Sequence, residues 1–147
     1  MNIDNVSRQG LVLSGWSDDW CFGTNAFEEA CRANGYASLS EAVRFVSEFG
    51  GVRGEHRAYR SSSTACFDLD PLKALRDISK ERVDNYVLRF GEVMVPVGEV
   101  LSGHLTLMIS SGGSVLGGYD DYLCIIGDSI ENGINAIFNF REYIEVS

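Results

Sequence analysis

Residues 93–126 read VMVPVGEVLSGHLTLMISSGGSVLGGYDDYLCII, and this stretch decides the fold. Short apolar runs alternate in it with clusters of Gly, Ser and Asp, which is the pattern of strands joined by tight turns. It predicts strands at 93–97, 105–110, 114–117 and 122–126. Strands joined by such short turns pair side by side in opposite directions, so this part of the chain is expected to form a mainly antiparallel sheet.

The segment before this stretch has the periodicity of helices. One helix is predicted over 25–34, followed by Gly35, which suits the left-handed position beyond a helix. A second helix is predicted to begin at a capping box formed by Ser38 and Glu41 and to end at Gly50. Both helices precede the predicted sheet.

The rest of the chain completes this pattern. Residues 52–64 are polar and read as a connection, and 65–69 alternates as a short strand would. Asp70 and Pro71 are typical of a helix cap and a first helical residue, and the apolar spacing that follows fits two helices or one kinked helix. Asp128 can cap a closing helix. The order predicts an α+β fold in which a mainly antiparallel central sheet is flanked by N-terminal and middle helices and a C-terminal helix.

The composition excludes several classes of protein. The chain has 147 residues, 45% of them hydrophobic, and a formal net charge of −9, which fits one soluble domain. An excess of negative charge opposes binding to nucleic acid phosphates and to anionic membranes. No run of 18 apolar residues and no secretory signal is found, so a cytoplasmic protein is expected. Ten of the twelve Lys and Arg lie in 32–89, whereas 90–140 holds six acids and no Lys or Arg.

The cysteines do not indicate a metal site or a cofactor. Cys21, Cys31, Cys66 and Cys124 are irregularly spaced, which predicts four reduced, mostly buried thiols and no zinc site. A Cys31 nucleophile with His104 as base is a formal alternative, because such pairs assemble in space. Cys31, however, lies on the apolar side of its predicted helix, where burial would raise its pKa and make it inert. We therefore expect no catalytic residues, no metal and no cofactor.

The glycine-rich segment 110–118 admits two interpretations. A phosphate cradle needs a strand, a glycine loop and then a helix. Another strand follows here, so the glycines predict a hairpin turn between Ile109 and Val115.

Two pairs of adjacent carboxylates, Asp18-Asp19 and Asp120-Asp121, lie beside aromatic residues. Neither pair has the spacing of a calcium loop, and solvated turns are the simplest interpretation. The alternative is that these loops form an acidic surface for a basic protein partner beside the aromatic residues Trp16, Trp20, Tyr119 and Tyr122. The competing interpretation of both tryptophans is packing in the core or at its rim. The candidate partner-binding residues are then Asp18, Asp19, Trp20, Tyr119, Asp120, Asp121 and Tyr122.

A series of short motifs resembles a known family. In order, they are Gly15-Trp16, the helix ending Phe49-Gly50-Gly51, Phe67 to Pro71, Phe90-Gly91 and Val95 to Glu99. The series is similar to that of the third subgroup of the SUKH superfamily of immunity proteins and covers nearly the whole chain. It implies one SUKH-like domain over residues 1–147, with an α+β fold. It also implies a bacterial cytosolic protein encoded beside polymorphic or contact-dependent toxins.

The resemblance implies a function without catalysis. Such proteins bind and neutralise a cognate toxin domain, such as a nuclease or a nucleic-acid deaminase, and the family offers no catalytic residues to carry over. We expect an antitoxin that covers the toxin's basic active-site surface, with its acidic loops standing in for nucleic acid phosphates. The alternative is a non-catalytic cytosolic ligand-binding or scaffolding domain of the same superfamily.

Overall fold

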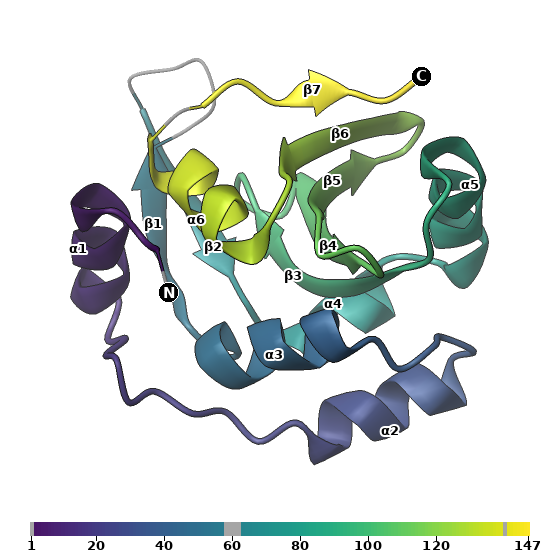
Figure 1. Cartoon of the computed structure of the whole chain (residues 1–147), viewed down its shortest axis with the longest axis horizontal. Coiled ribbons are helices and arrows are strands. Elements are labelled where there is room, and N and C mark those ends of the chain that lie inside the picture. The colour runs from purple at the N-terminus through teal and green to yellow at the C-terminus, as the bar shows by residue number, and fades with distance from the viewer. Residues whose placement is uncertain (1, 58–62, 140) are drawn as a thin grey trace.

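The structure is a computed structural model that describes residues 2–57, 63–139 and 141–147 (Figure 1). Along these residues, three helices come first, followed by two strands, two helices, four strands, a helix and a short last strand. The helices are α1 (Asn5–Leu13), α2 (Asn25–Ala33), α3 (Ser40–Phe49), α4 (Pro71–Asp77), α5 (Lys80–Phe90) and α6 (Ile130–Asn139). The strands are β1 (Arg53–Arg57), β2 (Thr64–Asp68), β3 (Met94–Val100), β4 (Leu105–Ser110), β5 (Val115–Tyr119), β6 (Tyr122–Gly127) and β7 (Ile144–Glu145).

The strands form one sheet whose order follows the chain, from β1 at one edge to β7 at the other. Every neighbouring pair is antiparallel. The register between β3 and β4 shifts between Pro96 and Gly98. The predicted α+β class, with helices flanking an antiparallel sheet, is confirmed.

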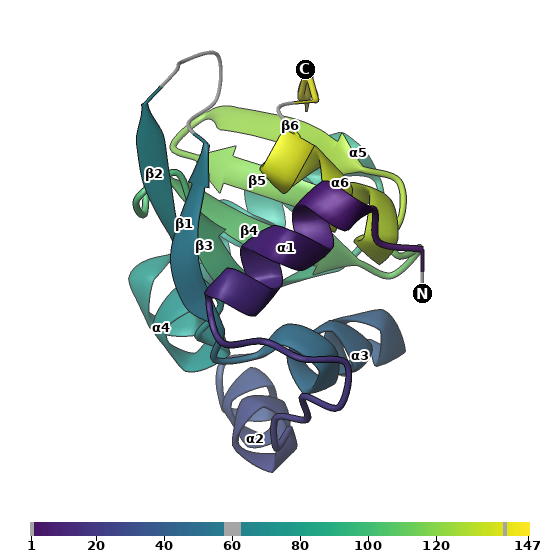
Figure 2. The same ribbon diagram turned by 90° about the vertical axis from the view of Figure 1, so that its left-hand side faces the viewer.

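Helices cover the two faces of the sheet unequally (Figures 1 and 2). On one face, α6 packs so closely on β5 that a Cβ atom on Gly133 would lie 2.4 Å from the Val115 side chain. Helix α3 joins this layer through an ion pair of 2.9 Å between Arg44 and Glu131 of α6. On the other face, α4 and α5 lie against β3 to β5, and the outer face of the β1–β2 hairpin remains open.

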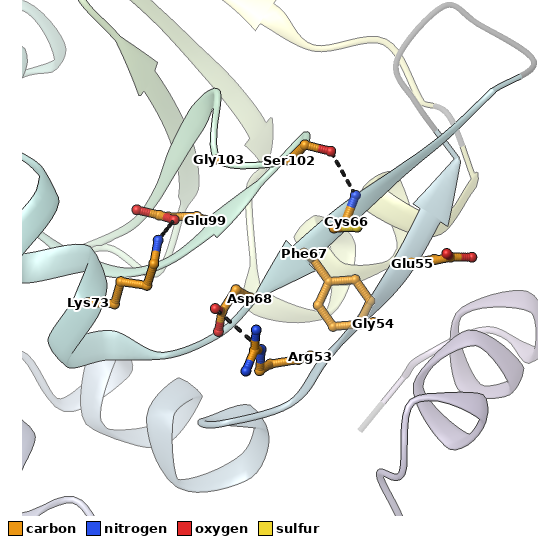
Figure 3. A pocket seen from close by; sticks show the side chains of 10 residues that line it. All are labelled: Arg53, Gly54, Glu55, Cys66, Phe67, Asp68, Lys73, Glu99, Ser102 and Gly103. Atoms are coloured by element: carbon orange, nitrogen blue, oxygen red, sulfur yellow. Dashed lines mark hydrogen bonds and ion pairs between the residues drawn. The ribbon is translucent and has the colours of Figure 1, made fainter.

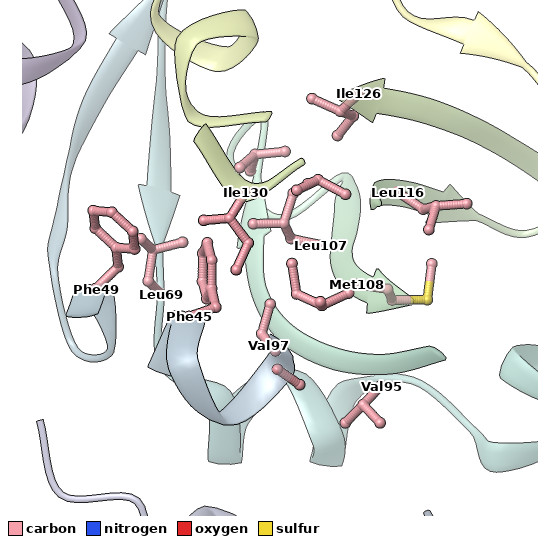
Figure 4. Close-up of a cluster of buried hydrophobic side chains, with 14 of the residues drawn as sticks. Phe45, Phe49, Leu69, Val95, Val97, Leu107, Met108, Leu116, Ile126 and Ile130 are labelled. Carbon is pink, nitrogen blue, oxygen red and sulfur yellow. The ribbon is translucent and has the colours of Figure 1, made fainter. Parts of the chain in front are cut away.

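The core lies between these layers (Figure 4). Phe45 of α3, Leu107 of β4 and Ile130 of α6 are almost fully buried and meet on the face covered by α3 and α6. Burying side chains of this size contributes about 1.5–3 kcal/mol each. Strands β3 and β4 are buried along their whole length, which explains their nearly continuous apolar sequence.

Three elements were not predicted from the sequence, namely α1, β1 and β7. Helix α1 contains Gly10 and buries only Ser7 and Leu11, so its apolar periodicity is weak. It is held by Asp4, which accepts a hydrogen bond of 2.9 Å from the amide of Ser7, and by packing on α6. Strand β1 lies within the polar stretch that was predicted to be a connection, and it pairs with β2 alone. Residues 58–62 of that stretch lie outside the described residues.

The predicted helix caps have mixed outcomes. Asp70 caps α4 as expected, because its side chain accepts from the amides of the first turn. The capping box at Ser38 is wrong, since α3 begins two residues later and its N-cap is Leu39, without a side-chain hydrogen bond. The closing helix α6 is capped by Ser129, whose Oγ accepts a hydrogen bond of 3.1 Å from the Asn132 amide, and not by Asp128.

Candidate partner-binding surface

The seven candidate residues fall into two separate groups. Asp18, Asp19 and Trp20 lie in the connection between α1 and α2, whereas residues 119–122 form the tip of the β5–β6 hairpin. Figure 1 shows the α1–α2 connection below α3 and the hairpin beside α5, on the opposite side of the molecule. The structure therefore does not bring the two predicted groups together into one surface.

The α1–α2 connection is anchored to α3 by its aromatic residues. Trp16 is buried and donates from Nε1 to the carbonyl of Glu48 at 2.9 Å, and Trp20 is partly buried and donates to the carbonyl of Gly50 at 3.0 Å. Asp18 forms an ion pair with Arg8. Much of this group is thus engaged within the protein.

The hairpin tip, in contrast, exposes its aromatic residues. Tyr119 is 53% exposed and Tyr122 is 36% exposed. Between them, Asp120 has a left-handed backbone (φ +49°), and its carbonyl accepts a hydrogen bond of 2.7 Å from Tyr86 Oη of α5. The tip is therefore held in place by the helix beneath it.

Arginines of α5 partly neutralise the hairpin. Arg82 forms an ion pair of 2.8 Å with the Asp121 carboxylate, and Arg89 donates to the Asp121 carbonyl at 2.8 Å. Among the described residues, the Asp120 carboxylate has no such partner. Asp120 is the carboxylate of this pair that stays available to another molecule.

A hollow opens where the β1–β2 hairpin leaves the sheet (Figure 3). Strand β2 pairs with β3 at one position, Asp68 opposite Glu99. Beyond this position β2 is hydrogen-bonded to the β3–β4 turn. The Ser102 amide donates to the Cys66 carbonyl at 2.8 Å, and Ser102 Oγ accepts from the Cys66 amide at 3.1 Å. The hollow lies on the outer face of β1 and β2, with a volume of about 610 Å³.

A row of residues crosses this face of the sheet. Cross-strand partners run from Arg53 of β1 through Asp68, Glu99 and Thr106 to Gly118 of β5, which is paired in turn with Leu123 of β6. Residues opposite each other in a sheet point to the same face, so the polar side chains lie together. Gly118 and Leu123 directly flank the β5–β6 hairpin tip, so the row connects the hollow to that predicted group.

Glu99 is the buried centre of the row. Its side chain is almost wholly enclosed, and Lys73 Nζ of α4 lies 2.6 Å from Glu99 Oε1 and 3.0 Å from Asp77 Oδ2. Burial raises the pKa of Glu99, although the hydrogen bond from Lys73 acts in the opposite direction. The hydrogen bonds to Glu99 and Asp77 raise the pKa of Lys73, and the one from Lys73 lowers the pKa of Asp77. One ammonium thus serves two carboxylates.

A second hollow, of about 540 Å³, reaches from this cluster to the hairpin tip. It shares Lys73, Glu99 and Gly103 with the first hollow, so the two form one concave surface. We call it the Glu99 surface. Its charged side chains are those of Arg53, Lys73 and Arg82 and the carboxylates of Glu55, Asp68, Asp77, Glu99 and Asp120. Carboxylates exceed cations, so the surface is suited to a basic partner.

Strained backbone borders the Glu99 surface. In the described part of the chain, the residues other than glycine with a positive φ are Leu101 (+53°), Ser102 (+56°) and Asp120 (+49°). The amide of Leu101 donates to Nε2 of the buried His56 at 3.0 Å, which helps to hold the turn. A left-handed non-glycine residue costs on the order of 1–3 kcal/mol and persists where its surroundings fix it, often at functional sites.

The thiols differ in exposure. Cys31 and Cys124 are buried, and burial raises the pKa of each to about 11, so neither is activated as a nucleophile. Cys21 and Cys66 are exposed, so the prediction of mostly buried thiols is wrong. His104 is exposed in the β3–β4 turn, whereas Cys31 faces the core.

The described residues contain no group of three or more His, Cys, Asp or Glu side chains that could hold a metal ion. They also contain no helix with the length and apolar character needed to cross a membrane.

Fold and surface together define an α+β protein with a concave, acidic surface that runs from the open β1–β2 hairpin past α4 to the β5–β6 hairpin. Residues 5–140 match the SUKH-3 immunity protein family, and the chain belongs to this family. The searches of the curated proteins and of the solved structures found no match. The resemblance noted in the sequence is thereby confirmed, and membership of an immunity protein family implies a cognate toxin as partner.

Proposed function

We propose that this protein neutralises its toxin by binding the toxin domain directly and covering its active site or substrate groove. The toxin in this proposal acts on nucleic acid, as a nuclease or a deaminase does, and has a basic active-site surface. The observation that carries the proposal is the acid excess of the Glu99 surface, where carboxylates can take the place of substrate phosphates.

In the proposed complex, charge and packing contribute to different steps of binding. Screening limits electrostatic interactions to about 8 Å at physiological salt, so the net charge of −9 mainly speeds association. Buried aromatic and apolar contacts then hold the two proteins together. The sequence offers two separate candidate groups for these contacts. One is formed by Asp18, Asp19 and Trp20, and the other by Tyr119, Asp120, Asp121 and Tyr122.

The proposed partner also implies where the protein acts. We propose that the protein acts in the bacterial cytoplasm, within a polymorphic toxin or contact-dependent inhibition system. There it protects the cell from a toxin encoded beside it. The regional acidity and the family membership support this assignment.

Co-expression with the product of the neighbouring reading frame tests the proposal. We expect that product to stop growth when expressed by itself, and co-expression of this protein to restore growth. The two proteins should co-purify, and a short nucleic acid duplex should slow their association by competing for the same groove. A toxin that kills cells regardless, without forming a complex, contradicts the proposed function.

A further inference from the structure

We infer that the toxin docks on the Glu99 surface through a basic segment that carries at least two Lys or Arg side chains, rather than on the α1–α2 connection. The inference rests on the proposed function and names the contact face and the chemistry of the segment that meets it. Charge pairing, exposed aromatic rings and fixed turn geometry each support this choice.

The carboxylates of the Glu99 surface differ in whether they form an ion pair. Arg53 lies 3.5 Å from Asp68, and Arg82 and Lys73 are engaged in the pairs described above. Within the described residues, Glu55 and Asp120 have no ion pair. Glu55 lines the hollow on the β1–β2 side, and Asp120 lines the hollow at the hairpin. A negative charge is therefore left without a counterion at each end of the surface.

Aromatic rings lie at the hairpin end of the Glu99 surface. The His104 ring meets Tyr119 edge to face, with 6.2 Å between their centroids, and both side chains are exposed. A tyrosine ring beside a carboxylate suits a guanidinium or ammonium group, which can stack on the ring and pair with the acid. Tyr119 can thus bury area against the same cationic side chain that Asp120 attracts.

The turns that border the surface are already fixed. The β3–β4 turn is tied to β2 through Ser102 and to the buried His56 through Leu101. The hairpin tip is tied to α5 through Tyr86. Binding to such a surface orders few additional residues, which lowers the entropic cost of association.

The α1–α2 connection offers less to a partner. Asp18 is already paired with Arg8, and the indole N–H groups of Trp16 and Trp20 are bound to carbonyls at the end of α3. Asp19 is the exposed carboxylate there without an ion pair among the described residues. A basic partner therefore meets fewer available groups on this side.

Two double variants with the same change in net charge test which of the two surfaces, the Glu99 surface or the α1–α2 connection, binds the toxin. The test variant is Glu55→Lys with Asp120→Asn, which keeps a residue that tolerates the left-handed backbone at position 120. The control is Asp19→Lys with Asp128→Asn, which changes the net charge by the same amount away from the Glu99 surface. Association and dissociation with the purified product of the neighbouring frame are measured by surface plasmon resonance, at low and at physiological salt. Thermal melts confirm that both variants fold.

We expect the test variant to associate roughly tenfold or more slowly at low salt, and the control to stay within about twofold of the unchanged protein. Tyr119→Ala should raise the dissociation rate roughly tenfold, because it removes buried area and not charge. Impairment of the control but not of the test variant would overturn the inference while leaving the proposed function intact. Absence of any complex with the unchanged protein would overturn both.

Discussion

Lys73 is the residue that pairs with the carboxylates at the centre of the Glu99 surface. Its ammonium lies between a buried carboxylate, Glu99, and a more exposed one, Asp77. A buried carboxylate that loses its cation bears the full cost of desolvation, so Lys73 matters more to stability than an exposed ion pair does. Lys73 is itself partly exposed, and solvent reduces this contribution.

Replacing Lys73 by Met should destabilise the protein by about 1–2 kcal/mol at pH 7, because neither carboxylate then has its cation. The pKa of Glu99 is raised and that of Asp77 is lowered. As pH falls, Glu99 is protonated first and Asp77 later, so the difference between variant and unchanged protein should shrink towards pH 4. Urea unfolding at a series of pH values measures it.

A second substitution provides the control for this prediction. Glu99→Gln removes the buried charge, so adding it to Lys73→Met should recover part of the lost stability at pH 7. A cost for Lys73→Met that is equal at pH 4 and pH 7 would show that its alkyl chain, and not its charge, is what matters.

At the scale of elements, the contact between α6 and the sheet depends on small residues. A Cβ atom on Gly133 would lie 2.4 Å from Cγ2 and 2.6 Å from Cβ of Val115. Gly127, where β6 ends, would similarly meet the backbone of α6 at Asn132 and Gly133. The helix therefore approaches the strands more closely than any larger side chain would allow.

Gly133→Ala tests this close approach. Alanine would favour the helix by about 1 kcal/mol, but overpacking against a branched side chain costs about 1–3 kcal/mol. We expect a net loss of roughly 1 kcal/mol in the free energy of unfolding, measured with urea. Adding Val115→Ala should make the Gly133→Ala change less costly, because Cγ1 and Cγ2 of Val115 are then removed and only the Cβ contact remains.

Gly23→Ala is the matched control, since nothing lies within 4 Å of a Cβ atom at that position. Its effect should be neutral or stabilising by less than about 1 kcal/mol. Equal losses at positions 23 and 133 would contradict the packing explanation.

At the scale of the whole molecule, one hydrophobic core joins all layers. Leu11 of α1, Phe27 of α2, Val83 of α5 and Ile134 of α6 belong to the same cluster of buried side chains. A single core predicts a single cooperative unit, including the N-terminal helix that the sequence did not reveal.

Urea unfolding monitored by two probes tests whether the protein unfolds as one cooperative unit. Tryptophan fluorescence reports on Trp16 and Trp20 beside α3, and far-ultraviolet circular dichroism reports on all elements. We expect coincident transitions, and Leu11→Ala should shift both equally, at a cost of about 2–4 kcal/mol. Two separated midpoints would contradict the single domain.

Part of the proposed partner-binding surface could be predicted from sequence. The hairpin tip could be predicted because its four residues, Tyr119 to Tyr122, are consecutive in the sequence and lie between recognisable strands. Lys73, Asp68 and Glu55 were missed, since they come from different elements and meet only through strand pairing and the packing of α4. A signal for Glu99 existed, because it is the one carboxylate in the apolar run 93–100.

The sequence by itself determined the antiparallel sheet and most of the helices, because apolar periodicity and glycine turns act over neighbouring residues. It also determined the acid excess and the family. Only the tertiary structure decided that α1 and β1 form, since each is stabilised by distant partners. The tertiary structure also separated the two predicted acidic loops and joined one of them to Glu99, because strand register and helix packing, not distance along the chain, decide which side chains meet.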